Sequence, residues 1–302
     1  MVIDKLISEI KKKKNPCIVG IDPDLCKIPT CYKLNATLNT VAIEEWALDV
    51  IDAVKDIVPA IKPQVAFFEV YGAEGIQVYQ RIIQYAHELG LIVIDDSKRG
   101  DIGNTAKAYA FAHLANDGPI NADFLTVSPF LGTDSLQPFV DMCIQDKKGL
   151  FILVKTSNPS STEISEATNR HGETILDWLA GYISKKAMDF KGQYGYSPVG
   201  AVVGATFPDE AKHLRKIMKN NFFLVPGYGA QGATAKDIID CFNEDGLGAI
   251  ISSSRSILYH YLKEEGYDGT RESYKKIVGR QAAVMQKEVY GELMSVFTNM
   301  TY

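Results

Sequence analysis

Residues 91–105 read LIVIDDSKRGDIGNT and decide the fold. The apolar, β-branched run Leu91–Ile94 is too short for a helix and predicts a buried strand. Five charged residues follow between positions 95 and 101. Because side chains alternate along a strand, Asp96 and Lys98 share one face, and Asp101 lies three residues beyond Lys98. Charges at the carboxyl end of a buried strand are typical of α/β active sites, although an ordinary turn with a solvated charge cluster is the alternative.

The rest of the chain repeats this pattern of a short apolar run followed by an amphipathic segment. We expect strands near 17–21, 60–64, 91–95, 124–127, 150–155, 199–203, 222–225 and 249–252. Helical periodicity covers about 41–57, 73–89, 104–117, 134–145, 173–189, 208–218, 233–244 and 254–264. The alternation predicts an α/β fold, a (β/α)8 TIM barrel, as one domain over residues 1–302. A doubly wound sheet of six or seven strands remains the alternative.

Two further helices are expected outside the repeat. Residues 1–14 form an amphipathic N-terminal helix without a signal-peptide core, and 271–298 form an extra C-terminal helix on the barrel exterior. The loops 22–39 and 157–172 are longer than a barrel requires, and loops at the carboxyl ends of strands usually lie over the site.

Composition excludes several classes of protein. The net charge of −5 argues against nucleic-acid binding through bulk charge. No apolar run approaches the roughly 20 residues that cross a membrane. The five cysteines are scattered and odd in number, which fits reduced cytoplasmic thiols better than disulfides or a metal site. We therefore expect a cytoplasmic protein with neither a nucleic-acid nor a membrane partner.

Other predicted strand ends also carry polar residues. Asp22 follows the first strand, Lys62 and Gln64 end the second, and Thr156 and Ser157 follow the fifth. The seventh strand leads into VPGYGAQG, residues 225–232, and the eighth into ISSSRSI, residues 251–257. TIM barrels usually bind phosphate at the turns after strands seven and eight, so these two turns predict a phosphate site in which the Arg255 guanidinium donates hydrogen bonds to the phosphate oxygens. The alternative is that both are ordinary turns.

Two lysines and two aspartates meeting in one mouth would form an alternating charge array in which each group keeps its neighbour ionised. A substrate carboxylate beside Asp96 would meet a like charge, and Lys98 could supply a proton. This arrangement suits loss of carbon dioxide and capture of the carbanion. No motif for thiamine, pyridoxal or a metal is visible, so fixed charges would stabilise the carbanion.

These motifs resemble the orotidine 5′-monophosphate decarboxylase family. The D-x-K-x-x-D pattern in DDSKRGDIGNT matches its signature, and the resemblance extends over nearly the whole barrel, in the order of the longer-chain bacterial and apicomplexan branch. The matching segments are VGIDPD, IKPQVAFFEVYG, ADFLTVSPFLG, VKTSNPSS, VVGAT, VPGYGAQG and the Ser254-Arg255 turn.

The resemblance implies a role for each candidate residue. Lys62, Asp96, Lys98 and Asp101 would form the catalytic tetrad, with Lys98 protonating C6 of the pyrimidine and no cofactor required. Family members are homodimers with shared sites, so Asp101, Ile102 and Thr105 would reach the partner's site. The implied substrate contacts are Asp22 and Lys62 to ribose, Thr156, Ser157 and Pro226 to the base, Gln231 between base and phosphate, and Ser254 and Arg255 to phosphate.

Two features depart from the expected pattern. Gln64 stands where many members have asparagine, which leaves a ribose contact or a supporting contact open. Ser254 stands where glycine is expected, and its amide can still donate if its backbone conformation allows.

Three other functions remain as alternatives. A metal-using phosphosugar decarboxylase or aldolase of the same superfamily would carry an acidic residue on the second strand, where this chain has Lys62. A Schiff-base aldolase would need a neutral lysine, which flanking aspartates disfavour. A non-catalytic nucleotide-binding barrel is expected to have lost a member of the tetrad.

Overall fold

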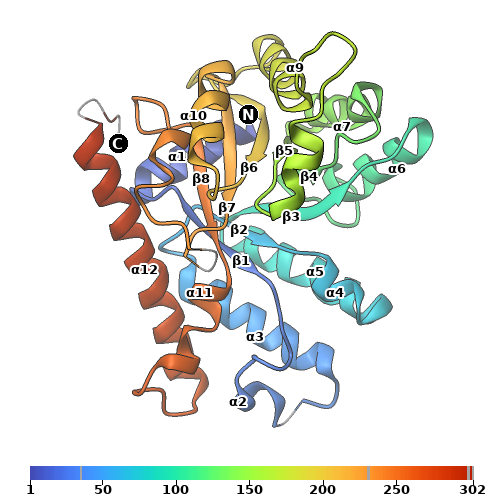
Figure 1. Ribbon diagram of the computed structural model, residues 1–302. Coiled ribbons are helices and arrows are strands. Elements are labelled where there is room, and N and C mark those ends of the chain that lie inside the picture. The colour runs from blue at the N-terminus through green and yellow to red at the C-terminus, as the bar shows by residue number, and fades with distance from the viewer. Residues whose placement is uncertain (35, 230–231, 298–299, 301–302) are drawn as a thin grey trace.

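The computed structural model describes residues 1–34, 36–229, 232–297 and 300. In this part of the chain eight parallel strands pair in sequence order and close into a barrel (Figure 1). The prediction of a (β/α)8 barrel is confirmed, and every predicted strand is present. The strands are β1 Cys17–Ile21, β2 Ala60–Pro63, β3 Ile92–Arg99, β4 Phe124–Val127, β5 Gly149–Lys155, β6 Ser197–Val203, β7 Asn221–Pro226 and β8 Ala249–Ser253.

The strand residues divide between two apolar clusters, as alternation across a closed sheet requires. One cluster lies between the barrel wall and the surrounding helices. The other fills the barrel interior, with Phe124, Phe151 and Phe222, and it also contains the apolar face of helix α1, Val2–Lys13. Ile3 and Leu6 of this helix are completely buried. The N-terminal helix therefore packs onto the interior cluster, away from the strand ends that carry the polar residues.

Helices cover the outside of the barrel, and α12 runs along it beside α3 (Figure 1). The longer helices are α3 Asn39–Val54, α5 Gly72–Glu88, α6 Gly103–Leu114, α7 Thr133–Asp146, α9 Ile175–Asp189, α10 Pro208–Ile217 and α12 Arg271–Val296. Short helices lie in the connections: α2 Thr30–Lys33, α4 Ala66–Glu69, α8 Thr162–Ser165 and α11 Arg255–Leu258. A 3-10 turn, Pro159–Ser161, precedes α8 in the loop after β5.

The predicted helix at 233–244 is wrong, because this segment holds only the 3-10 turn Ile239–Cys241. The carboxylate of Asp237 accepts hydrogen bonds from both the backbone nitrogen and the hydroxyl of Thr234, each at 2.7 Å. Such local side-chain bonds compete with helix formation. The predicted helix at 254–264 is also shorter than expected, since it divides into α11 and the 3-10 turn His260–Lys263.

Tyr259, between those two pieces, ties the long loop after β1 to the barrel. Its hydroxyl donates to the carbonyl of Asp22 at 2.7 Å and accepts from the backbone nitrogen of Asp24 at 2.8 Å. The ring stacks on Trp46 of α3 with centroids 6.4 Å apart. This contact fixes the backbone at Asp22 and joins the loop after β1 to the turn after β8.

Arg215 of α10 anchors the amino-terminal end of the barrel. It is buried, and its guanidinium lies 3.6 Å from the ring centroid of Phe223. Burial lowers the pKa of Arg215 to about 10, so the group stays charged at neutral pH. Its donors satisfy backbone carbonyls, those of Cys241, Met218, Asn221 and Gly248, at 2.7 to 3.0 Å.

Replacing Arg215 by methionine should therefore lower the free energy of unfolding by about 3 kcal/mol or more, because buried carbonyls lose their donors. Urea unfolding followed by circular dichroism measures this loss. The neighbouring exposed Lys216→Met is the matched control and should change stability by less than about 0.5 kcal/mol. A loss below about 1 kcal/mol for Arg215→Met would show that other groups or water satisfy these carbonyls.

Candidate active site

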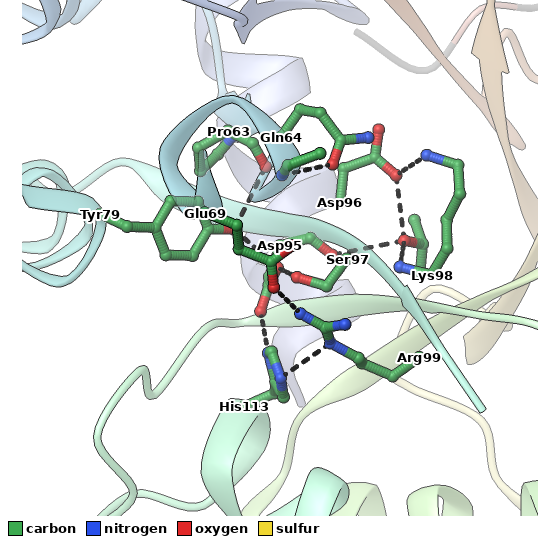
Figure 2. Close-up of polar contacts among 12 residues, drawn as sticks. Pro63, Gln64, Glu69, Tyr79, Asp95, Asp96, Ser97, Lys98, Arg99 and His113 are labelled. Atoms are coloured by element: carbon green, nitrogen blue, oxygen red, sulfur yellow. Dashed lines mark hydrogen bonds and ion pairs between the residues drawn. The ribbon is translucent and has the colours of Figure 1, made fainter. Parts of the chain in front are cut away.

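The carboxyl end of β3 directs its side chains to two sides of the barrel wall. Figure 2 shows Asp96 and Lys98 on one side of the strand and Asp95 and Ser97 on the other. Asp96 and Lys98 line a cavity at the barrel mouth together with Lys62 of β2, whereas Asp95 and Ser97 face outward. The strand extends to Arg99, beyond the predicted end at residue 95. The expected alternation of Asp96 and Lys98 on one face is therefore observed.

Asp96 lies between two lysines. Its Oδ2 is 2.7 Å from Nζ of Lys62, and its Oδ1 is 2.6 Å from Nζ of Lys98. Thr126 of β4 donates to Oδ1 at 3.0 Å. The Lys62 side chain is 8% exposed, while that of Lys98 is 44% exposed. Lys62 is thus a buried partner of Asp96, and Lys98 is the cation that remains accessible from the mouth.

The pKa values of this group favour the charged forms. Burial opposes the charge of Lys62, but the carboxylates of Asp96 and Asp22 outweigh it and raise the pKa of Lys62. Burial also opposes the charge of Asp96, yet the two lysines hold the pKa of that carboxyl well below its usual range. Both groups are therefore ionised across the neutral range.

Lys98 has an unusual backbone conformation. Its φ is 48°, in the left-handed region, which costs a non-glycine residue about 1–3 kcal/mol. The pairing of β3 with β4 shifts register between Asp95 and Arg99, and the Lys98 backbone nitrogen donates to Oγ1 of Thr126 at 2.9 Å. The bulge re-aims the strand at the point where the chemistry is expected.

A cavity of about 400 Å³ opens above this ion-paired group. A second cavity of about 130 Å³ adjoins it, since Lys62 and Pro226 line both. The first is also lined by Asp96, Lys98, Leu153, Thr156, Ser157, Asn158, Val202 and Leu224. The second is also lined by Asp22, Gly227, Tyr228, Ser252, Ser253, Ser254 and Arg255.

The smaller cavity brings together the turns after β7 and β8. The hydroxyl of Ser253 donates to the carbonyl of Tyr228 at 3.4 Å and lies 2.5 Å from the hydroxyl of Ser256. Arg255 is exposed at the rim. Because α11 has only 4 residues, local amides and the guanidinium, rather than a long helix dipole, supply the positive potential. Gln231 lies outside the described residues.

Ser254 adopts a φ of −124°, so it needs no glycine-like conformation. Gly20 of β1 lies beneath it, and a Cβ at Gly20 would overlap Oγ of Ser254. The absence of a side chain at position 20 therefore makes room for the serine that replaces the expected glycine.

Asp22 also points into the smaller cavity. Its Oδ1 is buried and has no hydrogen-bond partner among the residues that the structure describes. A buried carboxylate oxygen without a donor costs free energy, which a hydroxyl from a ligand would recover. The expected position of Asp22 at the site is observed.

Thr156 and Ser157 line the larger cavity from the end of β5. The Thr156 hydroxyl donates to Oδ1 of Asn158 at 2.7 Å. Gly204 after β6 permits the close approach of Ser157, because a Cβ there would be 3.1 Å from the Ser157 backbone nitrogen. Gln64 instead folds back on its own chain, where its Oε1 accepts from the backbone nitrogen of Ala66 at 3.2 Å.

Asp101, Ile102 and Thr105 are not among the residues that line either cavity of this chain. Asp101 accepts a hydrogen bond from the backbone nitrogen of Ile102 at 2.7 Å. Ile102 is 58% exposed, and Thr105 is also exposed. A single chain thus brings Lys62, Asp96 and Lys98 together but leaves Asp101 outside.

Sequence reasoning missed several residues of the site. Thr126 contacts both Asp96 and Lys98, and it is the one polar residue in the strand FLTV, a signal that alternation could have revealed. Leu153, Val202 and Leu224 give the larger cavity its apolar wall. Nothing in the local pattern separates these three from core residues.

No group of three or more His, Cys, Asp or Glu side chains is arranged to hold a metal ion within the described part of the chain. In the same residues no helix is sufficiently long and apolar to pass through a membrane.

Comparisons with known proteins agree on one family. Residues 17–267 match the model of the orotidine 5′-phosphate decarboxylase / HUMPS family. An orotidine 5′-phosphate decarboxylase of Clostridium novyi is 37% identical over 96% of this chain and 98% of its own length. One from Rhodopirellula baltica is 40% identical over 89% of this chain and 92% of its own length.

Solved structures lead to the same family. A crystal structure of a suggested orotidine 5′-phosphate decarboxylase from Streptomyces avermitilis superposes with a TM-score of 0.80 and 31% identity, over 95% of both chains. Sequence, fold and the charged group at the barrel mouth therefore lead to one assignment. This chain belongs to the orotidine 5′-phosphate decarboxylase family.

Proposed function

We propose that this chain decarboxylates orotidine 5′-phosphate to uridine 5′-phosphate and carbon dioxide in de novo pyrimidine biosynthesis, without a metal or organic cofactor. The observation that carries the proposal is the ionised Asp96 carboxylate, held 2.7 and 2.6 Å from the ammonium groups of Lys62 and Lys98 at the floor of the cavity. The family match and the relatives' names support the same reaction.

The two adjoining cavities suit the two ends of a nucleotide. The pyrimidine would occupy the larger one, against Pro226 and the apolar wall, with its polar edge toward Thr156 and Ser157. The phosphate would lie beside Ser254 and Arg255 in the smaller one, and Gln231 would bridge base and phosphate. Lys62 lines both cavities and Asp22 lines the smaller one, so their ammonium and carboxylate would bind the ribose hydroxyls.

In the proposed step the bond between C6 and the carboxylate breaks, carbon dioxide leaves, and the electron pair remains on C6. The negative charge of Asp96 disfavours the substrate carboxylate in the ground state. Lys98 stabilises the carbanion and then transfers its proton from Nζ to C6. Lys98 recovers a proton from solvent after the product leaves. The charges are fixed before substrate binds, which is the condition for strong electrostatic stabilisation.

Lys62 distinguishes this reaction from that of metal-using phosphosugar enzymes. A buried ammonium ion on β2 repels a divalent cation at the position where such an enzyme would need an acidic ligand. A Schiff base requires a neutral amine. Burial opposes the charge of Lys62, but Asp96 and Asp22 outweigh burial and raise the pKa of Lys62, which disfavours the neutral amine.

We also propose a homodimer in which Asp101, Ile102 and Thr105 complete the site of the partner. Ile102 is 58% exposed, and exposed apolar side chains at Phe111 (45%) and Phe130 (79%) lie on α6 and on the loop after β4. Exposed apolar surface of this kind is typical of protein interfaces.

The five cysteines of the described chain are free thiols, which suits the reducing cytoplasm proposed as the compartment.

The purified protein should lower the ultraviolet absorbance of orotidine 5′-phosphate at the same rate with and without EDTA. This is expected because the proposed charge stabilisation needs no metal. The control is the product, uridine 5′-phosphate, whose absorbance should stay constant. No turnover, or turnover that appears only with added Mg²⁺, would contradict the proposed function and favour the metal-using branch or a nucleotide-binding barrel.

Lys98→Ala should lower kcat by a factor of about 1,000 or more, because a proton donor and a charge that acts in the transition state are lost together. Calorimetric binding of uridine 5′-phosphate should change by less than about tenfold, since Lys98 is assigned to chemistry rather than to product binding. Equal losses of turnover and of product affinity would mean that Lys98 is a binding or structural residue.

Mixing Lys98→Ala with Asp101→Ala protein should restore activity if the partner chain supplies Asp101. In a mixed dimer one site has both wild-type residues and the other has neither, so random exchange gives about one quarter of the wild-type rate. Differently tagged chains and co-purification measure the fraction of mixed dimers. Absence of activity in proven mixed dimers would contradict the shared site.

A further inference from the structure

The outward side of β3 carries a second polar network that the proposed chemistry does not use. Asp95 is fully buried, and its carboxylate accepts from Oη of Tyr79 at 2.6 Å, from Oγ of Ser97, and from Nδ1 of His113 at 2.5 Å (Figure 2). The donors come from α5, from β3 itself and from α6. Asp95 is the residue that precedes Asp96, so the network begins directly behind the ion-paired carboxylate.

The direction of hydrogen bonding through His113 follows from Arg99. The Nε of an arginine always carries its hydrogen, so at 3.3 Å it donates to Nε2 of His113. Nε2 must then be unprotonated, and Nδ1 holds the hydrogen that is donated to Asp95. The guanidinium also donates to Glu69 at 2.7 Å. A chain of hydrogen bonds thus runs from Glu69 at the surface, through Arg99 and His113, to the buried Asp95.

This network encloses the strained part of β3. Lys98 has its φ of 48° between Ser97 and Arg99, and both of these neighbours are tied into the network. A strained conformation persists only where the surrounding contacts determine it. On the inward side the Lys98 backbone nitrogen donates to Thr126. The outward contacts therefore hold the strand on both sides of Lys98.

The same network reaches the other lysine of the site. Oη of Tyr79 lies 3.3 Å from the carbonyl of Pro63, the residue after Lys62 on β2. Burial raises the pKa of Tyr79 well above its usual range, and the negative charge of Asp95 raises it further, so the hydroxyl remains a donor at all ordinary pH values. Asp95 is therefore linked to the backbone beside all three charged residues of the site.

We infer that His113 and Asp95 are positioning residues, which hold the bulge of β3 so that Lys98 points its ammonium group at Asp96 and at the reacting carbon. They touch no ligand and act through the backbone. The inference rests on the proposed function, because it assigns their effect to the step that Lys98 performs.

A second pair in the same barrel provides a matched control. Nε2 of His87 lies 3.0 Å from Oδ2 of Asp123, which also accepts from the backbone nitrogen of Val93 at 2.9 Å. This pair joins α5 to the amino-terminal ends of β3 and β4, remote from the bulge. It is also a histidine–aspartate pair between a helix and the barrel, but it lies at the opposite end of β3 from Lys98, and the His87 side chain is 27% exposed against 6% for His113.

The experiment compares His113→Leu, His113→Asn and His87→Leu in the full chain. His113→Leu should lower kcat by about 10-fold to 100-fold while the Kd for uridine 5′-phosphate stays within about 2-fold. His113→Asn keeps an amide donor near the position of Nδ1 and should recover most of the rate, to within about 3-fold of wild type. His87→Leu should leave kcat within about 2-fold, whatever it does to thermal stability.

Hydrogen–deuterium exchange gives a measurement that does not depend on catalysis. The peptide containing Ser97–Gly100 should exchange at least about 5-fold faster in His113→Leu than in wild type, and at the wild-type rate in His87→Leu. If His113→Leu does not fold, Ser97→Ala takes its place, because it removes one donor to Asp95 without disturbing a helix. The turnover rate of that variant should fall by at least about 3-fold.

The inference is overturned if His113→Leu and His87→Leu lower kcat equally, or if the rate per product-binding site is unchanged in His113→Leu. It is also overturned if exchange around Lys98 does not increase. These outcomes differ from failure of the proposed function, in which the wild-type protein itself would not turn over orotidine 5′-phosphate.

Discussion

The structure depends on the Asp96 carboxylate, which is held between the ammonium groups of Lys62 and Lys98. Asp96 is 8% exposed, and breaking either of its ion pairs would leave a charge in a poorly solvated place. The ion pair to Lys62 joins β2 to β3, and the hydrogen bond from Thr126 joins β3 to β4. The site is therefore part of the barrel wall, and its charges are oriented by strands rather than by mobile loops.

Fixing charges in this way has a cost in backbone conformation. The left-handed conformation of Lys98 and the shifted register beside it are unfavourable by themselves, and the contacts on both sides of the strand compensate for them. Because side chains alternate along a strand, one face of β3 presents charges to the cavity and the other face holds the backbone in place. Asp96 and Lys98 face the cavity, while Asp95 and Arg99 bind the strand to α5, α4 and α6, and Ser97 donates to Asp95.

The sequence predicted much of this arrangement, and the reasons are local. Apolar runs followed by polar strand ends define a barrel, and alternation alone places Asp96 and Lys98 together. What could not be predicted depends on tertiary contact. Asp237 bonds Thr234 within the expected helix at 233–244, and the bulge at Lys98 is flanked by contacts to β4 and α6 that lie far away in the sequence. The role of His113 could not be predicted from its helix, because its partner Asp95 is 18 positions away in the sequence.

Gly20 and Ser254 show that two positions of the site are chemically interdependent. A side chain at position 20 would overlap the hydroxyl of Ser254, so the present position of this serine depends on the glycine at position 20. Glycine at 254 would be compatible with Gly20, whereas alanine at 20 would require either the Ser254 hydroxyl to move or a smaller residue at 254. The effect of a substitution at position 20 therefore depends on the residue at position 254, and the same alanine has less space beside a serine than beside a glycine.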